Sequence, residues 1–242
     1  MTSAPPPTAP PSVLPGIRAL CFDLDDTFWD VKPVLVRAEA RVAEFIAARH
    51  PGLSPHLTAE SVYDTRLALA AEHPARAHDM TWLRTEALRR IAARHGHDPS
   101  IGDAAFEVFI AARNEVHLFD DVRPALTALG ARFALATLSN GNADLRRIGI
   151  DGHFVGVLNA ESVGCAKPRP EAFHAAAAAL GVAPSEMLYV GDNPHLDVAG
   201  ARAAGCRAAW VNRIGAVWPE GLSPEADLEV PDLSALAMRL GA

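Results

Sequence analysis

Lysine is scarce in this sequence. Of the 22 basic residues only two are lysines, Lys32 and Lys167, and the rest are arginines. Arginine is therefore accepted wherever a positive charge alone is required, and each lysine indicates a position where a compact point charge is preferred to a planar guanidinium. Lys167 precedes Pro168 in a segment that leads into a helix. We interpret it as a functional residue, with a surface lysine as the alternative.

Cysteine is also scarce. The three cysteines, Cys21, Cys165 and Cys206, are odd in number and lack the spacing of metal ligands. This pattern predicts reduced thiols in a cytosolic protein, with packing as the default role of each. Because Cys165 lies two residues from Lys167, a redox role for Cys165 stays open.

Long apolar runs and basic runs are missing as well. No window reaches the ~18 continuous apolar residues of a membrane span. The net charge is -7 and no basic segment is interleaved with aromatic residues, which argues against binding to a nucleic-acid backbone. Residues 1–16 contain six prolines and lack the basic start and apolar run of a signal peptide, so we expect a disordered or extended tail. Together these absences predict a cytoplasmic protein.

What the sequence does contain is a change of hydrophobic period. Residues 30–117 have the apolar spacing of consecutive helices. Residues 17–29 and 118–242 instead alternate short apolar strands with helices, which is typical of parallel strands joined by right-handed crossovers. We therefore expect an α/β fold: a doubly wound, Rossmann-like parallel sheet forms the core, and an all-helical domain is inserted at 30–117. A chain of 242 residues that is 50% apolar can fill both parts.

Three carboxylates follow the first predicted strand. Asp23, Asp25 and Asp26 come directly after the apolar run 17–22. Like charges this close together repel, and burying them unpaired costs several kcal/mol. We therefore expect a cation among them, most simply Mg2+. The alternative is an acidic turn that is solvated at the end of the strand.

Polar residues also end two later strands. Ser139 and Asn140 follow one of them, where a tight turn is the alternative interpretation. Asp192 and Asp197 follow another, and their spacing lets one carboxylate bind a metal ion while the other supports a bound water or Lys167. Asp197 would equally suit a helix N-terminus for its charge alone. Because the carboxyl ends of parallel strands meet at one edge of a sheet, these residues should converge.

The order of these segments resembles that of the four motifs of the haloacid dehalogenase superfamily, over roughly residues 17–240. The helical insert resembles the cap domain of that family, which closes over the site, excludes water and selects the substrate. The segments that carry the resemblance are Asp23-Leu24-Asp25-Asp26-Thr27, Ser139-Asn140-Gly141, Lys167-Pro168, and Gly191-Asp192 with Asp197.

The resemblance implies a role for each motif residue. Asp23 is implied to be the nucleophile that attacks phosphorus, and Asp25 the general acid and base. Ser139 and Lys167 are implied to hold the phosphoryl oxygens, while Mg2+ is bound by Asp23, Asp192 and the main-chain carbonyl of Asp25. Four further residues are expected to lie around these groups and hold them in position: Thr27, Asn140, Asn193 and Asp197.

Within this superfamily Asp25 favours a phosphatase. A phosphate ester needs an acid to protonate its leaving alkoxide, whereas halide leaves as a stable anion without one. A 2-haloacid dehalogenase and a phosphomutase are therefore less favoured alternatives. A non-catalytic phosphate binder is a third, against which we note that such a protein would be free to lose Asp23 or Lys167.

The expected substrate is a small phosphate ester. Residues 30–34 and 78–84 look like those of a bacterial branch that dephosphorylates flavin mononucleotide and the ribitylaminouracil phosphate of riboflavin synthesis. This resemblance implies a flat ring on a phosphorylated polyol, with nucleotides and sugar phosphates as alternatives. The candidate substrate contacts, two rings for stacking and two cations for polar edges, are Trp29, Trp82, Lys32 and Arg84.

Overall fold

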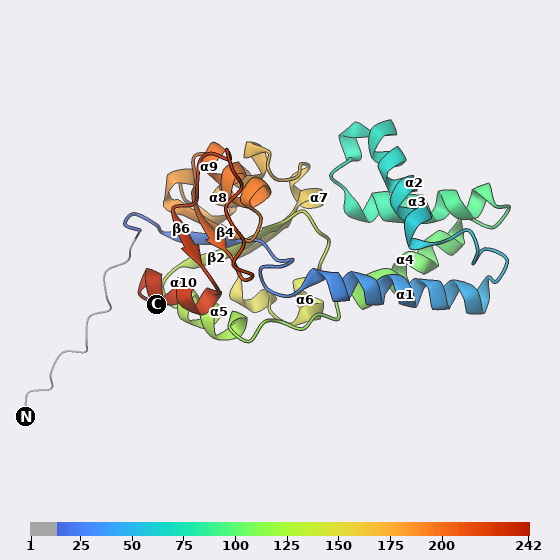
Figure 1. Cartoon of the computed structure of the whole chain (residues 1–242), viewed down its shortest axis with the longest axis horizontal. Helices are drawn as coiled ribbons and strands as arrows, with labels where there is room; N and C mark the ends of the chain where they lie inside the picture. Colours follow the sequence, from blue (N-terminus) through green and yellow to red (C-terminus); the bar gives the residue numbers. More distant parts are fainter. Residues whose placement is uncertain (1–13) are drawn as a thin grey trace, which may run out of the picture.

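The computed structural model describes residues 14–242, which form two lobes joined by two connections (Figure 1). Most of the tail predicted at 1–16 lies outside the described residues. Leu14 is only 6% exposed and packs in the core. Within the described part of the chain, no helix combines the length and the apolar character needed to span a membrane.

The larger lobe contains a single six-stranded sheet, in which each neighbouring pair of strands is parallel. The strand order is β3-β2-β1-β4-β5-β6, with β1 at the centre. The predicted fold class, a Rossmann-like parallel sheet with helices, is confirmed. The strands are β1 (Ala19–Phe22), β2 (Ala134–Ser139), β3 (Gly156–Asn159), β4 (Met187–Gly191), β5 (Arg207–Val211) and β6 (Leu228–Val230).

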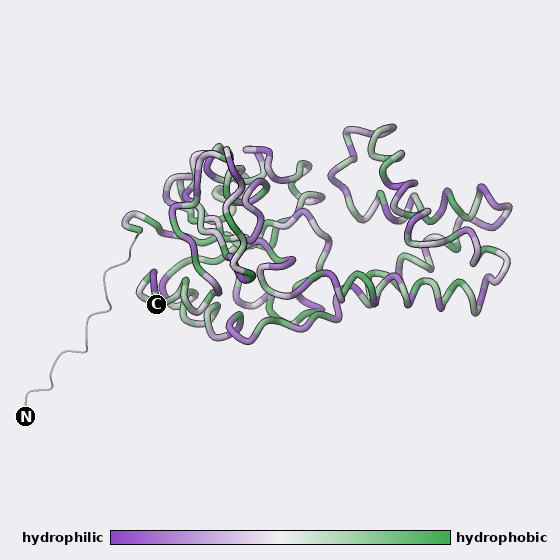
Figure 2. Tube along the Cα trace, in the orientation of Figure 1, coloured by the Kyte–Doolittle hydropathy of each residue, from purple (hydrophilic) through white to green (hydrophobic). Residues whose placement is uncertain are grey.

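Helices cover both faces of this sheet because its central strands are apolar on both sides. In β1, Leu20 and Phe22 point into one apolar cluster, and Ala19 and Cys21 point into the other. Figure 2 shows the hydrophobic colouring continuing along the buried strands. The first cluster packs against α5 (Val122–Gly130) and α10 (Leu233–Leu240), and the second against α8 (Pro170–Leu180) and α9 (Gly200–Ala203). Shorter helices are α6 (Leu145–Ile148), α7 (Ala160–Val163) and the 3-10 turns Pro74–Arg76, Asp151–His153 and Pro184–Glu186.

The smaller lobe, called here the helical insert, has an apolar core of its own. Three of its four long helices begin at side-chain caps: Asp30, Thr58 and Asp79 each accept a hydrogen bond from a main-chain N–H of the first turn. The helices are α1 (Val31–Arg49), α2 (Ala59–Glu72), α3 (Met80–Arg94) and α4 (Ser100–Arg113).

One element differs from the sequence-based prediction. The pattern predicts a continuous helix from Pro194 to Ala204, but the chain forms a π-helical turn, Pro194–Ala199, before α9. The cause is visible in the main chain, where the carbonyl of Asn193 accepts from the N–H groups of Asp197 at 3.0 Å and Val198 at 3.3 Å. Single π turns of this kind are frequent at functional sites.

The three cysteine side chains are buried as free thiols. Burial raises the pKa of Cys206 to about 11 and that of Cys21 further still. Such values oppose thiolate formation at neutral pH. Cys165, the candidate for a redox role, is 7% exposed.

Candidate active site

The carboxyl ends of three neighbouring strands meet at one cavity. Asp23 follows β1, Ser139 ends β2 and Asp192 follows β4, while Lys167 comes from the loop before α8. The cavity has a volume of about 190 Å³. It is lined by Asp23, Asp25, Asp26, Ser139, Asn140, Gly141, Lys167, Asp192, Asn193, Leu196 and Asp197.

Lys167 is the cation at the centre of this site. Its Nζ donates hydrogen bonds to Oδ1 of Asp23 at 2.6 Å and to Oδ1 of Asp197 at 2.7 Å. A third bond, at 2.7 Å, goes to the hydroxyl of Tyr189, which in turn donates to the carbonyl of Leu138. Burial alone would lower the pKa of Lys167, but Asp197 and Asp23 outweigh it and hold this pKa above its usual value. Lys167 is therefore a fixed positive charge.

The surroundings of Asp23 disfavour the charged form of its carboxyl group. It is 8% exposed, and burial raises the pKa of its carboxyl well above the ordinary value. Lys167 opposes this shift, whereas the carboxylates of Asp197 and Asp192 add to it. One lysine does not balance the negative charge gathered here.

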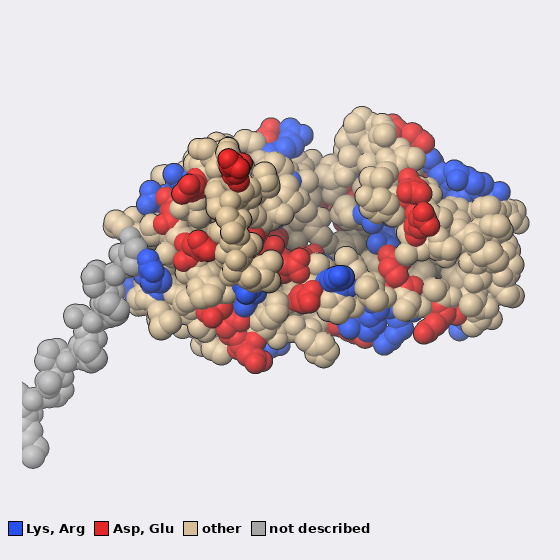
Figure 3. Space-filling view, viewed as in Figure 1, with Lys and Arg blue, Asp and Glu red and all other residues tan. Residues whose placement is uncertain are grey.

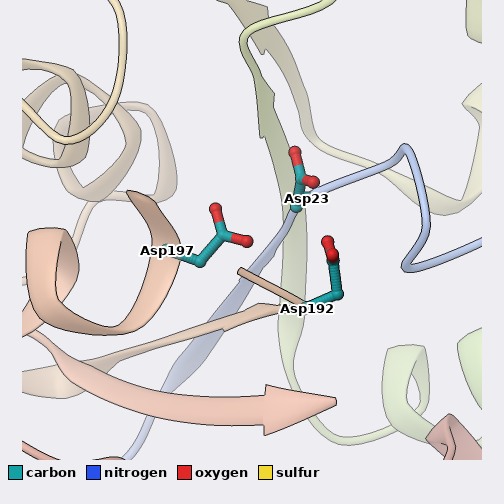
Figure 4. Close-up of side chains that lie close together, drawn as sticks. All are labelled: Asp23, Asp192 and Asp197. Atoms are coloured by element: carbon teal, nitrogen blue, oxygen red, sulfur yellow. The ribbon is translucent and has the colours of Figure 1, made fainter. Parts of the chain in front are cut away.

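The excess negative charge forms a cluster that suits a metal ion. Asp23, Asp192 and Asp197 each offer a carboxylate oxygen, and these atoms all lie within 4.8 Å of one another. Figure 4 shows the three carboxyl groups around a common space. Asp192 pairs with no cationic side chain among the described residues, and its Oδ1 accepts only from Thr27, at 3.3 Å. Burial, Asp197 and Asp26 raise the pKa of Asp192 to about 7. The candidate ligand atoms are all carboxylate oxygens, and they carry more negative charge than Lys167 neutralises. Such a set fits a hard divalent cation.

Asp25 is held by two donors from its own surroundings. Trp29 Nε1 donates to Oδ1 at 2.9 Å, and Nη2 of Arg113, at the end of α4, lies 2.7 Å from both carboxylate oxygens. Its Oδ2 lies 2.8 Å from the point where a Cβ on Gly141 would stand, and Ser139 Oγ lies 3.4 Å from that point. Only glycine leaves room for these two side chains to face the same space.

The two asparagines of the predicted motifs orient their neighbours. The side chain of Asn140 accepts from the Lys167 N–H at 2.8 Å and donates to the Lys167 carbonyl at 3.0 Å, which fixes the lysine loop against β2. The N–H of Asn193 donates to Oδ2 of Asp197 at 2.9 Å. Because Oδ1 of Asp197 already accepts from Lys167, both oxygens of this buried carboxylate are engaged.

The four predicted substrate contacts are not among the residues that line this cavity. Trp29 is fully buried and faces Asp25. Lys32 is exposed on α1. The guanidinium carbon of Arg76 lies over the ring of Trp82, 4.2 Å from the ring centre. Arg84 is buried in the helical insert, where it pairs with Glu39 at 2.6 Å and lies 3.6 Å over the ring of Phe109.

Sequence reasoning missed two residues that touch the site, Arg113 and Tyr189. Tyr189 lies in the middle of an apolar strand, where the pattern predicts a core residue. Its ring does pack in the core, and its hydroxyl contacts Lys167. Arg113 lies 88 positions from Asp25 and is one of twenty arginines, so no local pattern distinguishes it. The only available signal was its position at the end of the last predicted helix of the insert.

Known proteins resemble this chain over most of its length. A family described as haloacid dehalogenase-like hydrolases matches residues 17–205. A 5-amino-6-(5-phospho-D-ribitylamino)uracil phosphatase from Escherichia coli strain K12 is 31% identical, over 91% of this chain and 94% of its own length. A glyceraldehyde 3-phosphate phosphatase from Methanopyrus kandleri is 32% identical, over 89% of this chain and 91% of its own.

A solved structure is also closely similar. The crystal structure of a 2-haloacid dehalogenase from Pseudomonas syringae pv. Tomato DC3000 superposes with a TM-score of 0.88 at 37% identity, covering 93% of this chain and 98% of that one. The relatives thus include both phosphatases and dehalogenases, but they share one fold and one family. The chain belongs to the haloacid dehalogenase-like hydrolases.

Proposed function

We propose that this protein is a metal-dependent phosphomonoester hydrolase that acts through an aspartyl-phosphate intermediate. The observation that carries the proposal is the position of Asp25, whose carboxyl group lines the same cavity as Asp23 and Ser139. An acid beside the nucleophile is what cleavage of an alkyl phosphate requires, because the leaving alkoxide must take up a proton.

Asp25 also separates this proposal from the dehalogenase alternative that the Pseudomonas structure raises. A departing halide needs no proton, so a dehalogenase has no use for an acid held beside its nucleophile. A cavity of about 190 Å³ whose lining includes the donors Ser139 and Lys167 beside Asp23 and Asp25 suits a phosphoryl group.

The proposed cation is Mg2+, bound by carboxylate oxygens of Asp23 and Asp192 and by the main-chain carbonyl of Asp25. Magnesium prefers oxygen ligands and is commonly held by one or two carboxylates together with substrate phosphate. Asp197 instead holds Lys167 in place, as its 2.7 Å bond indicates. When bound, the cation would offset the negative charge shared by the phosphoryl group and Asp23.

The chain's own residues then account for the two steps. In the first, an oxygen of Asp23 bonds to phosphorus, the ester P–O bond breaks and Asp25 gives its proton to the leaving oxygen. In the second, Asp25 takes a proton from water, whose oxygen bonds to phosphorus and releases Asp23 and inorganic phosphate. Ser139 and Lys167 donate to the non-bridging oxygens in both steps.

We further propose that the substrate is a small phosphorylated metabolite, with flavin mononucleotide and 5-amino-6-(5-phosphoribitylamino)uracil as the first candidates. The Escherichia coli relative supports this class. A cavity of about 630 Å³ between insert and core has room for a ring. Its lining includes Thr81, Phe106 and Ile110 from the insert and Asn142 from the core. Sugar phosphates and nucleotides are the alternatives, the first supported by the Methanopyrus relative.

The test is phosphate release from a panel of phosphomonoesters, with halide release from 2-haloacids measured in parallel. We expect phosphate release that a chelator abolishes and that Asp23→Asn removes, since an amide oxygen is a poor nucleophile. A tenfold preference for flavin mononucleotide corresponds to about 1.4 kcal/mol of transition-state binding and would support the ring-bearing class. Halide release without phosphate release would overturn the proposal.

A further inference from the structure

Arg113 is a residue of the insert that reaches into the catalytic site of the core. It ends α4, is 2% exposed, and its Nη2 lies 2.7 Å from each carboxylate oxygen of Asp25. Figure 3 shows acidic and basic side chains on both lobes beside their junction. The Arg113–Asp25 pair is therefore a direct link between the lobes.

Packing alone is a poor explanation for this arginine. Its second terminal nitrogen, Nη1, is buried and has no hydrogen-bond partner among residues 14–242, which costs folding free energy. The nearest ring, that of Trp29, lies 5.9 Å from the guanidinium carbon. Within the described part of the chain, the short polar contacts of this guanidinium are therefore those with Asp25.

The residue that follows strengthens the link. Asn114 Oδ1 accepts from the main-chain N–H of Asp144 at 2.7 Å, in the loop that follows β2. Two consecutive residues at the end of α4 thus attach the insert to Asp25 and to the segment that follows β2. A shift of α4 relative to the core would change both contacts together.

We infer that Arg113 is a positioning residue through which the helical insert orients Asp25 for proton transfer. The inference rests on the proposed phosphatase function. An oxygen of Asp25 must face the leaving group in the first step and water in the second, and a small misplacement is costly in rate. The charge-assisted contact from Arg113 and the bond from Trp29 together limit rotation of the carboxyl group.

The test compares two esters that differ in their need for an acid. An alkyl phosphate has a poor leaving group that must be protonated, whereas p-nitrophenyl phosphate has a good one that needs little protonation. The value of kcat/KM is measured for both with the wild type, Arg113→Ala, Arg113→Gln, Arg113→Lys and Asp25→Asn. The double variant Asp25→Asn/Arg113→Ala completes a cycle.

We expect Arg113→Ala to lower kcat/KM for the alkyl ester on the order of 10²-fold and for the aryl ester several-fold less. In the Asp25→Asn background the same substitution should have little further effect, because the group it positions has lost its function. Arg113→Lys should keep part of the kcat/KM for the alkyl ester that Arg113→Ala loses. If alanine lowers the melting temperature by more than a few degrees, Arg113→Gln, which keeps most of the stem, takes its place.

The control is Arg90→Ala, which removes a half-exposed arginine of the insert that pairs with Glu72 at 2.7 Å. It should leave both esters unchanged. Equal losses for the two esters, or losses that multiply in the double variant, would overturn the inference while leaving the proposed function intact. A wild type that hydrolyses neither ester would overturn the proposed function and this inference with it.

Discussion

Lys167 contacts two carboxylates with a single positive charge. Its Nζ is surrounded by three oxygens at 2.6–2.7 Å, and the side chain is 3% exposed. A guanidinium is larger and planar, and it spreads its donors over a fork that this space does not match. This geometry explains why a lysine stands at this position in a chain whose basic residues are mostly arginines.

We predict that Lys167→Arg and Lys167→Met each lower kcat at least about 10²-fold, because a charge held against the transferring group is lost or displaced. The methionine variant should also lose about 3 kcal/mol of stability, since two buried carboxylates are left without their partner. Steady-state kinetics and urea unfolding measure the two effects. Arg169→Lys, at an exposed position two residues away, is the control. An active Lys167→Arg variant would contradict this role.

Several of these residues could be predicted from the sequence because each follows an apolar strand. Asp23, Ser139 and Asp192 share that position, and parallel topology brings such positions together. The Arg113–Asp25 contact could not be predicted in this way, because it depends on how the insert sits on the core. The four substrate contacts stay predictions, and one of them, Trp29, is fully buried and donates to Asp25.

At the scale of elements, the end of β4 and the π-helical turn after it act as one unit. The turn brings Asp197 back over the strand, so a Cβ built on Gly191 would lie 2.4 Å from Oδ2 of Asp197. A π turn needs a main-chain hydrogen bond between residues five positions apart. Neither the composition nor the hydrophobic period of Pro194–Ala199 predicts such a bond. The strand and the carboxylate spacing were therefore predictable, but the shape of the turn was not.

We predict that Gly191→Ala lowers kcat on the order of 10²-fold, because the added methyl group displaces Asp197 and with it Lys167. Overpacking at this position should also cost about 1–3 kcal/mol of stability. Gly156→Ala is the matched control in β3, where the nearest atom to an added Cβ is a leucine methyl at 3.4 Å. Kinetics and thermal unfolding of both variants check the prediction, which an active Gly191→Ala variant would refute.

At the scale of the whole molecule, the fold alone does not decide the reaction. The same two-lobed architecture is found in a 2-haloacid dehalogenase structure at a TM-score of 0.88, and the relatives include phosphatases. The difference must lie in single groups placed on a shared frame. The parallel direction of the strands follows from the alternation of strands and helices, whereas the choice of substrate depends on side chains from two lobes that meet only after folding.

The excess negative charge should also make the stability of the whole protein depend on metal and pH together. The pKa of Asp192 is raised to about 7, so without metal the folded state binds more protons than the unfolded state between about pH 4 and 7. This group therefore makes the metal-free protein less stable as pH rises through that range. A divalent cation removes the repulsion, but protons compete with it at lower pH.

We predict that Mg2+ raises the melting temperature by several degrees more at pH 8 than at pH 6, and that Asp192→Asn removes most of this difference. Differential scanning calorimetry with and without chelator measures it, and an equal rise at both pH values would show that Asp192 does not bind the ion.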